Sequence, residues 1–247
     1  MKKIALLGYG VVGKGVRDII EKRGDMEVVR VLVRREIAEV AAISTTNIDD
    51  IVSDPAIDTV VEVMGGVHPA FEYISAALRA GKNVVTANKA VISACYRQLT
   101  ELAAENGVAL RCTAAVGGGI PWLINLERCR RIDTVTEVSG IMNGTTNYIM
   151  DAMHKSPVAF ADILKKAQEL GYAEADPSAD IDGDDIRRKL TISANIAFDA
   201  LLNEEDIPMF GIRTVTDGDI ATFQSEGYVC KLIATARKTE GGVAAWL

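Results

Sequence analysis

The sequence predicts an α/β protein with a Rossmann-type, doubly wound parallel sheet, followed by a second domain of α+β type. Strand-length apolar runs alternate with helix-period segments through the first half of the chain. A glycine-rich turn over residues 8–13 follows the first run and opens the first helix. From about residue 130 the order changes to a strand, several helices and then strands. We therefore expect a dinucleotide-binding domain over 1–125 and a substrate domain over 126–247.

The first half supplies the elements of the parallel sheet. Strands are expected at 2–7, 27–33, 58–64, 83–86 and 108–112. Their hydrophobicity is continuous rather than alternating, which indicates burial on both faces of a sheet. Helices are expected at 11–23, 47–53, 68–80 and 90–105, the last of them followed by Gly107 as a stop signal.

The second half has fewer strands and more helices. A strand is expected at 132–142, helices at 143–154, 157–170 and 182–200, and further strands at 228–237 and 243–247. A strand followed by several helices and then strands again is typical of an α+β domain.

The overall charge limits the classes of partner. The 247 residues include 27 Lys+Arg and 34 Asp+Glu, a net charge of −7. An acidic chain lacks the basic surface that sequence-independent nucleic-acid binding needs, so a phosphate-bearing ligand requires a local cationic patch. No charge-free run of about 18 apolar residues is present, so no transmembrane helix is predicted. We expect neither a nucleic acid nor a membrane as a partner.

Targeting and thiol signals point to the cytoplasm. The N-terminal apolar run is short, is interrupted by glycines and Lys14, and lacks a cleavage site, so we expect no signal peptide. The four cysteines form no C-x-x-C pair and have no histidine at metal-ligand spacing. Reduced thiols in a cytoplasmic protein are therefore expected.

The glycine-rich turn predicts a dinucleotide site. Gly8 permits the tight turn, Gly10 lets a pyrophosphate approach the backbone, and Gly13 lets the helix pack closely on the strand. The phosphates then lie at the helix N-terminus, which Val11 and Val12 begin. The alternative is a glycine-rich surface turn without a ligand.

The residues after the second strand predict which dinucleotide binds. NAD-binding proteins usually place Asp or Glu there for the ribose hydroxyls, whereas this chain has Arg34 and Arg35, with Glu36 next. A guanidinium suits a 2′-phosphate and cannot accept hydrogen bonds from a ribose diol. We expect NADP(H) to be preferred over NAD(H), unless the two arginines are merely solvated.

Three further segments are expected at the carboxyl ends of the strands, where doubly wound sheets bind ligands. They are 64–66, 86–89 and 116–121. Gly65, Gly66 and Gly118 allow close approach of a flat nicotinamide or an anion. Lys89 directly follows a buried strand and is a candidate functional cation, the alternative being a surface lysine.

The second half holds a dense cluster of charged residues at 174–189. Asp185 and Lys189 are four residues apart on a predicted helix and share a face. From this spacing alone, a functional pair and a solvated ion pair are both open. Asp184 and Arg188 have the same spacing, and we expect them to form a solvated ion pair. The acids lack the spacing of a calcium-binding EF-hand loop.

The segment 143–147 opens a helix after a strand. Asn143, Gly144 and Thr145 combine small polar side chains with free helical amides, which suits a carboxylate ligand. The alternative is an ordinary helix cap.

Together these segments resemble the homoserine dehydrogenase family. The matching strings follow the family's order over nearly the whole chain: GYGVVGKG at 8–15, VVEVMGG at 60–66, VVTANKA at 84–90, AVGGGIP at 115–121, GIMNGTTNYI at 140–149, GYAEADPSADIDGDDIRRKL at 171–190 and GYVCKLIA at 227–234. The stretch from 140 to 190 is the most specific of them. The resemblance implies reversible NAD(P)H-dependent reduction of aspartate 4-semialdehyde to L-homoserine, on the route to threonine and methionine, and a second domain that serves catalysis and dimerisation.

The resemblance also implies residue roles. Lys189 is the acid/base candidate, Asp185 orients it or binds substrate, and Lys89 lies close to the reacting group. Glu174 holds the substrate's amino group, and Asp180 belongs to the substrate site with the 143–145 segment. The glycine turn and Arg34 belong to the cofactor.

The chain departs from the family in two respects. Members often carry a glutamate that helps to bind a monovalent cation, with backbone carbonyls near Val116 and Gly118; Thr113 stands there in this chain, which weakens the expectation of sodium. Family chains also continue beyond the KLIA segment, so the sheet that joins two subunits in a homodimer would be incomplete and a regulatory domain has no room. A truncated, non-catalytic dinucleotide-binding paralogue is therefore one alternative, and a dehydrogenase of another small amino-acid aldehyde is a second.

Overall fold

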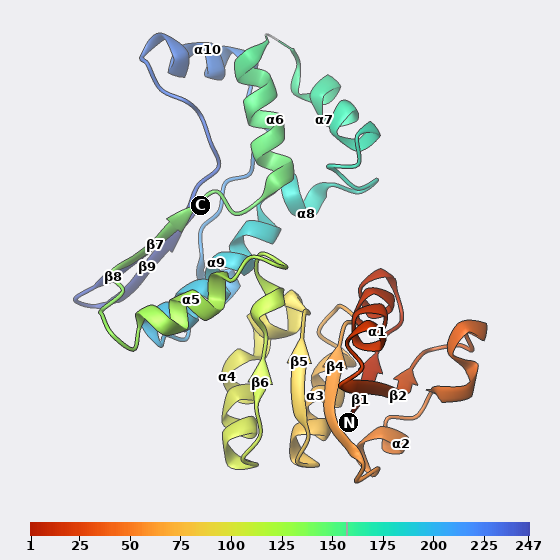
Figure 1. The fold of residues 1–247 in the computed structure, drawn as a ribbon. Coiled ribbons are helices and arrows are strands. Elements are labelled where there is room, and N and C mark those ends of the chain that lie inside the picture. Colours follow the sequence, from red (N-terminus) through yellow and green to blue (C-terminus); the bar gives the residue numbers. More distant parts are fainter. Residues whose placement is uncertain (157) are drawn as a thin grey trace. The chain divides into compact units, whose positions relative to one another are not determined.

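The chain divides into two compact units, Met1–Ile124 and Asn125–Leu247, in the computed structural model (Figure 1). The structure describes residues 1–156 and 158–247. The first residue of the helix expected at 157–170 therefore lies outside the described residues.

The first unit is built on a six-stranded parallel sheet with the strand order β3-β2-β1-β4-β5-β6. Its strands are β1 (Lys2–Leu7), β2 (Met26–Leu32), β3 (Ser44–Thr45), β4 (Ile57–Glu62), β5 (Asn83–Thr86) and β6 (Leu110–Arg111). Its helices are α1 (Val11–Arg23), α2 (Asp49–Val52), α3 (Ala70–Arg79) and α4 (Lys89–Glu105), with 3₁₀ turns η1 (Ala38–Ile43) and η2 (Thr113–Ala115). The predicted Rossmann-type sheet is confirmed.

The strand order reverses between β1 and β4, and this creates the topological switch point of the sheet. Ala5, Leu6 and Leu7 are fully buried, which accounts for the unbroken apolar run of β1. Helix α1 ends at Gly24 in the left-handed conformation, as a glycine cap permits. The two-residue β3 has no counterpart in the sequence analysis, because a strand this short carries no period.

The second unit combines a three-stranded antiparallel sheet, in the order β7-β8-β9, with helices (Figure 1). The strands are β7 (Glu137–Gly140), β8 (Ala234–Thr239) and β9 (Gly242–Trp246). Its helices are α6 (Gly144–Lys155), α7 (Phe160–Glu169), α8 (Ser178–Ile181), α9 (Asp184–Phe198) and α10 (Asp217–Ser225), with the 3₁₀ turn η3 (Glu204–Asp206). Helix α5 (Trp122–Cys129) begins at the end of the first unit and continues into the second. The predicted α+β type of the second half agrees with this arrangement.

Several of the predicted strands were too long: the one expected at 58–64 ends at Glu62, and the one expected at 108–112 is confined to Leu110–Arg111. Two larger differences lie in the second unit. The strand expected at 132–142 is confined to Glu137–Gly140, and the one expected at 228–237 starts at Ala234. In both segments apolar residues such as Ile132 and Val229 are exposed, so hydrophobicity overestimated the strand. Helices α5, α8 and α10 were not predicted.

Helix α9 lies on the sheet of the second unit and anchors its core. Ile186, Leu190 and Ala194 recur on one face of the helix and pack against Ala234 and Ala236 of β8. Burial of this face fixes the orientation of the polar residues on the same helix. No helix within residues 1–156 and 158–247 is long and apolar enough to span a membrane.

Candidate functional site

The glycine turn has the geometry that close approach requires. Gly8 has φ +100°, and a Cβ there would lie 3.0 Å from the Val63 carbonyl oxygen. A Cβ on Gly13 would lie 2.5 Å from the Gly8 carbonyl oxygen, which is too close for any other residue. A Cβ on Gly10, by contrast, would meet nothing within 4 Å, so this face of the turn is open. The arrangement fits a phosphate group at the start of α1.

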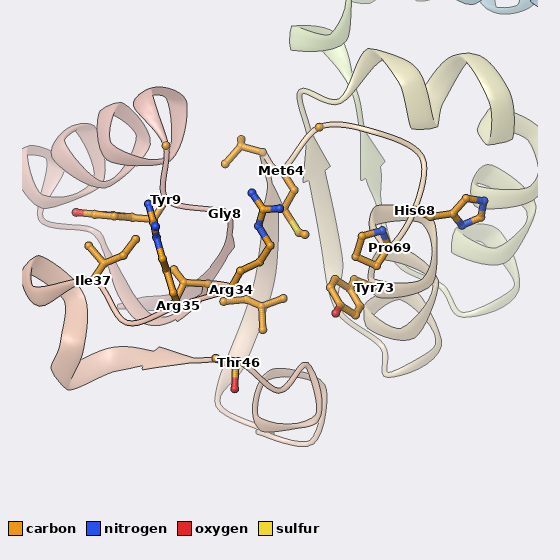
Figure 2. Close-up of a pocket in the computed structure, with 15 residues that line it drawn as sticks. Gly8, Tyr9, Arg34, Arg35, Ile37, Thr46, Met64, His68, Pro69 and Tyr73 are labelled. Atoms are coloured by element: carbon orange, nitrogen blue, oxygen red, sulfur yellow. The ribbon is translucent and has the colours of Figure 1, made fainter.

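A cavity of about 970 Å³ adjoins this turn in the first unit. Figure 2 shows Arg34 and Arg35 on one side of it, with His68, Pro69 and Tyr73 on the other. The remaining lining residues are Gly8, Tyr9, Gly10, Leu32, Val33, Ile37, Thr46, Val63, Met64 and Gly65. The cavity therefore joins the glycine turn to the ends of β2 and β4.

The lining chemistry suits an anionic ligand with flat apolar parts. Two guanidinium groups reach the cavity, and none of the described residues that line it is Asp or Glu. A guanidinium binds phosphate well and cannot accept hydrogen bonds from ribose hydroxyls.

A smaller cavity of about 380 Å³ lies against the ends of β4 and β5. Val12, Val63, Met64, Gly65, Ala87, Asn88, Lys89 and Ala90 line it. Val63, Met64 and Gly65 also line the larger cavity. The segments predicted at 64–66 and 86–89 therefore do meet at one edge of the sheet, and Lys89 begins α4 there.

A charged network beside the glycine turn was not predicted. The buried Tyr9 hydroxyl donates to Glu39 Oε1 at 2.7 Å and accepts from Arg17 at 3.0 Å. Lys14 pairs with Glu39 Oε2 at 2.9 Å, and this hydrogen bond lowers the pKa of the Glu39 carboxyl. Burial, reinforced by Glu39, raises the pKa of Tyr9. The network ties η1, and with it the chain after Arg34 and Arg35, to α1.

The segment proposed for a cation lies between η2 and α5. Val116 is buried there and Gly118 is exposed. Within the described ranges, no group of three or more His, Cys, Asp or Glu residues could hold a metal ion.

In the second unit, four predicted residues form one polar cluster. Lys189 Nζ lies 2.7 Å from Asp185 Oδ2 and donates to the Met142 carbonyl at 2.7 Å. Asn143 Nδ2 donates to Asp180 Oδ1 at 2.7 Å and to Asp185 Oδ2 at 2.9 Å. Asn143 is also the cap of α6, since its Oδ1 accepts from the Thr146 amide at 2.8 Å. The capping residue Asn143 thus binds the carboxylates of Asp180 and Asp185, and Asp185 in turn pairs with Lys189.

Burial distinguishes this cluster from a surface ion pair. The side chains of Lys189 and Asp185 are only 19% and 11% exposed. Desolvation lowers the pKa of Lys189, while the charge of Asp180 acts in the opposite direction. A half-buried lysine with a lowered pKa, held beside carboxylates, is the kind of group that transfers protons in active sites.

Neighbouring charges on α9 serve other contacts. Asp184 was expected to pair with Arg188, and this was wrong: Asp184 pairs with Arg187 at 2.9 Å, and Arg188 pairs with Glu204 at 3.3 Å. The i,i+3 neighbour competes for the carboxylate, and spacing alone could not choose between them.

Other predicted residues of the second unit lie apart from these contacts. Glu174 is exposed, and its backbone carbonyl accepts from Gln168 at 3.0 Å. Thr145 is buried and its hydroxyl donates to the Tyr172 carbonyl at 2.6 Å, while Gly144 is exposed at the start of α6. Thr145 thereby joins α6 to the loop that carries Glu174.

Comparison with known proteins gives matches over both units. The model of the homoserine dehydrogenase family matches residues 121–246, and that of the homoserine dehydrogenase NAD-binding domain matches residues 8–113. The homoserine dehydrogenase of Bacillus subtilis is 39% identical over 96% of this chain. The chain spans 58% of the length of that relative.

Solved structures give the same result. A homoserine dehydrogenase from Thiobacillus denitrificans superposes with a TM-score of 0.90 and 37% identity, over 99% of this chain and 60% of its own. A putative homoserine dehydrogenase from Archaeoglobus fulgidus, at 32% identity and a TM-score of 0.84, is covered over 84% of its length. Because the two family models match consecutive segments that together span most of its length, this chain belongs to the homoserine dehydrogenase family.

Proposed function

We propose that this chain catalyses the reaction of its family, the reversible NAD(P)H-dependent reduction of L-aspartate 4-semialdehyde to L-homoserine, in threonine and methionine biosynthesis. The observation that carries the proposal is the cluster around Lys189, in which Asn143 links Asp180 and Asp185. This cluster belongs to a chain whose first unit has a cavity suited to a dinucleotide.

The chemistry of an aldehyde reduction calls for such a lysine. The bound dinucleotide supplies the hydride, and negative charge then develops on the carbonyl oxygen. An ammonium stabilises that charge and donates the proton that completes the alcohol. Lys189 is assigned this role, Asp185 orients its ammonium, and Lys89 acts close to the reacting group.

The other predicted residues divide between substrate and cofactor. Asp180 and the 143–145 segment belong to the substrate site, with Glu174 binding the substrate's amino group. The glycine turn, Val11, Val12, the two arginines, Gly65, Gly66 and Gly118 belong to the cofactor. We further propose a cytoplasmic homodimer, and sodium held by the carbonyls of Val116 and Gly118.

The direct test is the loss of reduced-nicotinamide absorbance when the 247-residue chain is mixed with aspartate semialdehyde and NADPH or NADH. Turnover with either cofactor supports the proposal. Binding of NADPH without turnover of this aldehyde would favour a non-catalytic dinucleotide-binding protein, and turnover only with another amino-acid aldehyde would reassign the substrate.

Replacing Arg34 and Arg35 by alanine is expected to lower the affinity for NADPH about tenfold or more, while the affinity for NADH changes little. The reason is that a charge-assisted hydrogen bond to phosphate contributes about 1.5–3 kcal/mol, and only NADPH carries the 2′-phosphate. Titration of each cofactor against both proteins measures the ratio. An unchanged ratio contradicts the proposed NADP(H) preference.

Replacing Glu174 by alanine is expected to raise KM for aspartate semialdehyde about tenfold or more, because the substrate's ammonium loses its carboxylate partner. Cofactor affinity should stay at the wild-type value. Glu169→Ala, at the end of α7, is a matched control for loss of one negative charge. Unchanged substrate affinity in the Glu174 variant contradicts the role.

A further inference from the structure

We propose that Glu62 is a positioning residue, whose buried carboxylate holds together the two loops that line the cofactor cavities. The inference rests on the proposed function in one respect, that a nicotinamide dinucleotide binds at these cavities. Glu62 is the last residue of β4 and is fully buried. It pairs in register with Leu7 of β1 on one side and Thr86 of β5 on the other.

A carboxylate at this position is costly unless hydrogen bonds replace its water. Glu62 Oε1 accepts from the Met64 backbone amide at 2.7 Å and from Asn88 Nδ2 at 3.3 Å. Glu62 Oε2 accepts from the Thr86 hydroxyl at 2.6 Å. Met64 lies in the loop after β4, Thr86 is the last residue of β5, and Asn88 lies in the loop that follows β5. A single buried group therefore joins both loops to the end of the sheet.

Asn88 connects Glu62 both to the loop after β4 and to the start of α4. Its Nδ2 donates to the Gly66 carbonyl at 2.6 Å, and its backbone amide donates to the Thr86 hydroxyl at 2.9 Å. Its Oδ1 accepts from the Val91 amide at 3.3 Å and caps α4, whose first residue is Lys89. The position of Lys89 is thus linked to the 64–66 loop through Asn88 and Glu62.

The two loops shape the cavities directly. Met64 and Gly65 line both cavities, and Ala87, Asn88 and Lys89 line the smaller one. Gly65 and Gly66 have φ of +81° and +74°, so the 64–66 loop contains two successive glycines in the left-handed conformation. Glycine has more backbone conformational freedom than any other residue. The bonds from Glu62 and Asn88 restrict that freedom, and ordering a loop in advance lowers the entropy lost when a ligand binds.

A positioning role and a purely structural role predict different results. If Glu62 only supports the fold, its replacement lowers the unfolding temperature but leaves cofactor affinity intact wherever the protein is folded. If it positions the loops, affinity falls in fully folded protein. NADPH and NADH must then weaken in parallel, because the loops lie at the ends of β4 and β5 whereas Arg34 and Arg35 follow β2.

The test measures Kd for NADPH and for NADH by fluorescence titration of the 247-residue chain, with Glu62→Gln compared with wild type below the unfolding temperature of both. The amide keeps the size and one acceptor, but its bonds lose the charge that about doubles their strength. We expect both Kd values to rise about tenfold, which corresponds to about 1.4 kcal/mol, with the NADPH/NADH ratio unchanged. Thr86→Val, which replaces the hydroxyl by a methyl group, should act in the same direction.

Lys82→Met provides the control, because Lys82 directly precedes β5, at the end of that strand opposite to Thr86. Lys82 is buried, and its Nζ donates to the Asp54 and Ile57 carbonyls at 2.7 and 3.0 Å. Its loss should lower the unfolding temperature and leave both Kd values unchanged. This variant shows whether removal of any buried, charged, hydrogen-bonding group weakens cofactor binding, or only removal of the Glu62 charge.

Each outcome decides between the claims. Wild-type protein that binds neither dinucleotide overturns the proposed function and, with it, this inference. Wild-type protein that binds while folded Glu62→Gln binds equally well overturns the inference alone, as does a change in the NADPH/NADH ratio. If Glu62→Gln does not fold, Thr86→Val decides by the same criteria.

Discussion

Lys189→Ala is expected to lower kcat for the reduction of aspartate semialdehyde by about 10²–10⁴-fold, the contribution usual for a positioned acid or base. Lys189 Nζ is the donor that the cluster holds in place, between Asp185 and the Met142 carbonyl. Alanine removes the ammonium that would stabilise and protonate the forming alkoxide. Steady-state kinetics with saturating cofactor measure the loss.

The affinity for NADPH in this variant should remain close to that of wild type, since Lys189 is assigned to proton transfer. Arg188→Ala is the matched control, because it removes the adjacent cation of α9, whose partner is Glu204. We expect nearly normal turnover in that control. A near-normal rate in Lys189→Ala excludes the lysine as proton donor, and an equal loss in Arg188→Ala points to damage of the helix instead.

Prediction from sequence was most successful where one physical signal dominates. Helix α1 begins after Gly10 and ends at Gly24, so its two boundaries coincide with residues whose backbone preferences are strong. Strands β1 and β5 have the predicted bounds, and the last four residues of β1, an unbroken apolar run, are all buried. The signal fails for β3, a two-residue strand that only its neighbour β2 defines.

The site residues show a similar limit. The motifs pointed to Asn143, Asp185 and Lys189 separately, and the structure shows that Asn143 bridges Asp180 to Asp185. No spacing rule predicts a bond between residues 37 or 42 positions apart in the sequence. Glu62 left a usable signal, because it is a charged residue within the apolar segment predicted as a strand at 58–64, and a buried carboxylate must have hydrogen-bond partners. Which partners it has depends on the pairing of β4 with β5.

Asp185→Asn is expected to lower kcat about 10²-fold, the cost of a displacement of about 1 Å in a catalytic group, and to move the pH profile. Burial already holds the pKa of Lys189 below its ordinary value. Reduction needs the protonated lysine, so its rate falls as the pH rises through this pKa. The carboxylate at 2.7 Å favours the charged lysine, and its neutralisation must lower the pKa further.

The alkaline fall of the reduction rate should therefore occur at lower pH in Asp185→Asn than in wild type, while homoserine oxidation, which needs the neutral lysine, should become active at lower pH. A shift of both limbs to lower pH is the mark of a single lysine whose pKa governs both directions of the reaction, because a general loss of structure would lower both rates without shifting either limb. Asp184→Asn removes the neighbouring carboxylate, which pairs with Arg187, and should leave both profiles in place. A shift of both limbs toward higher pH in Asp185→Asn contradicts the assigned electrostatics.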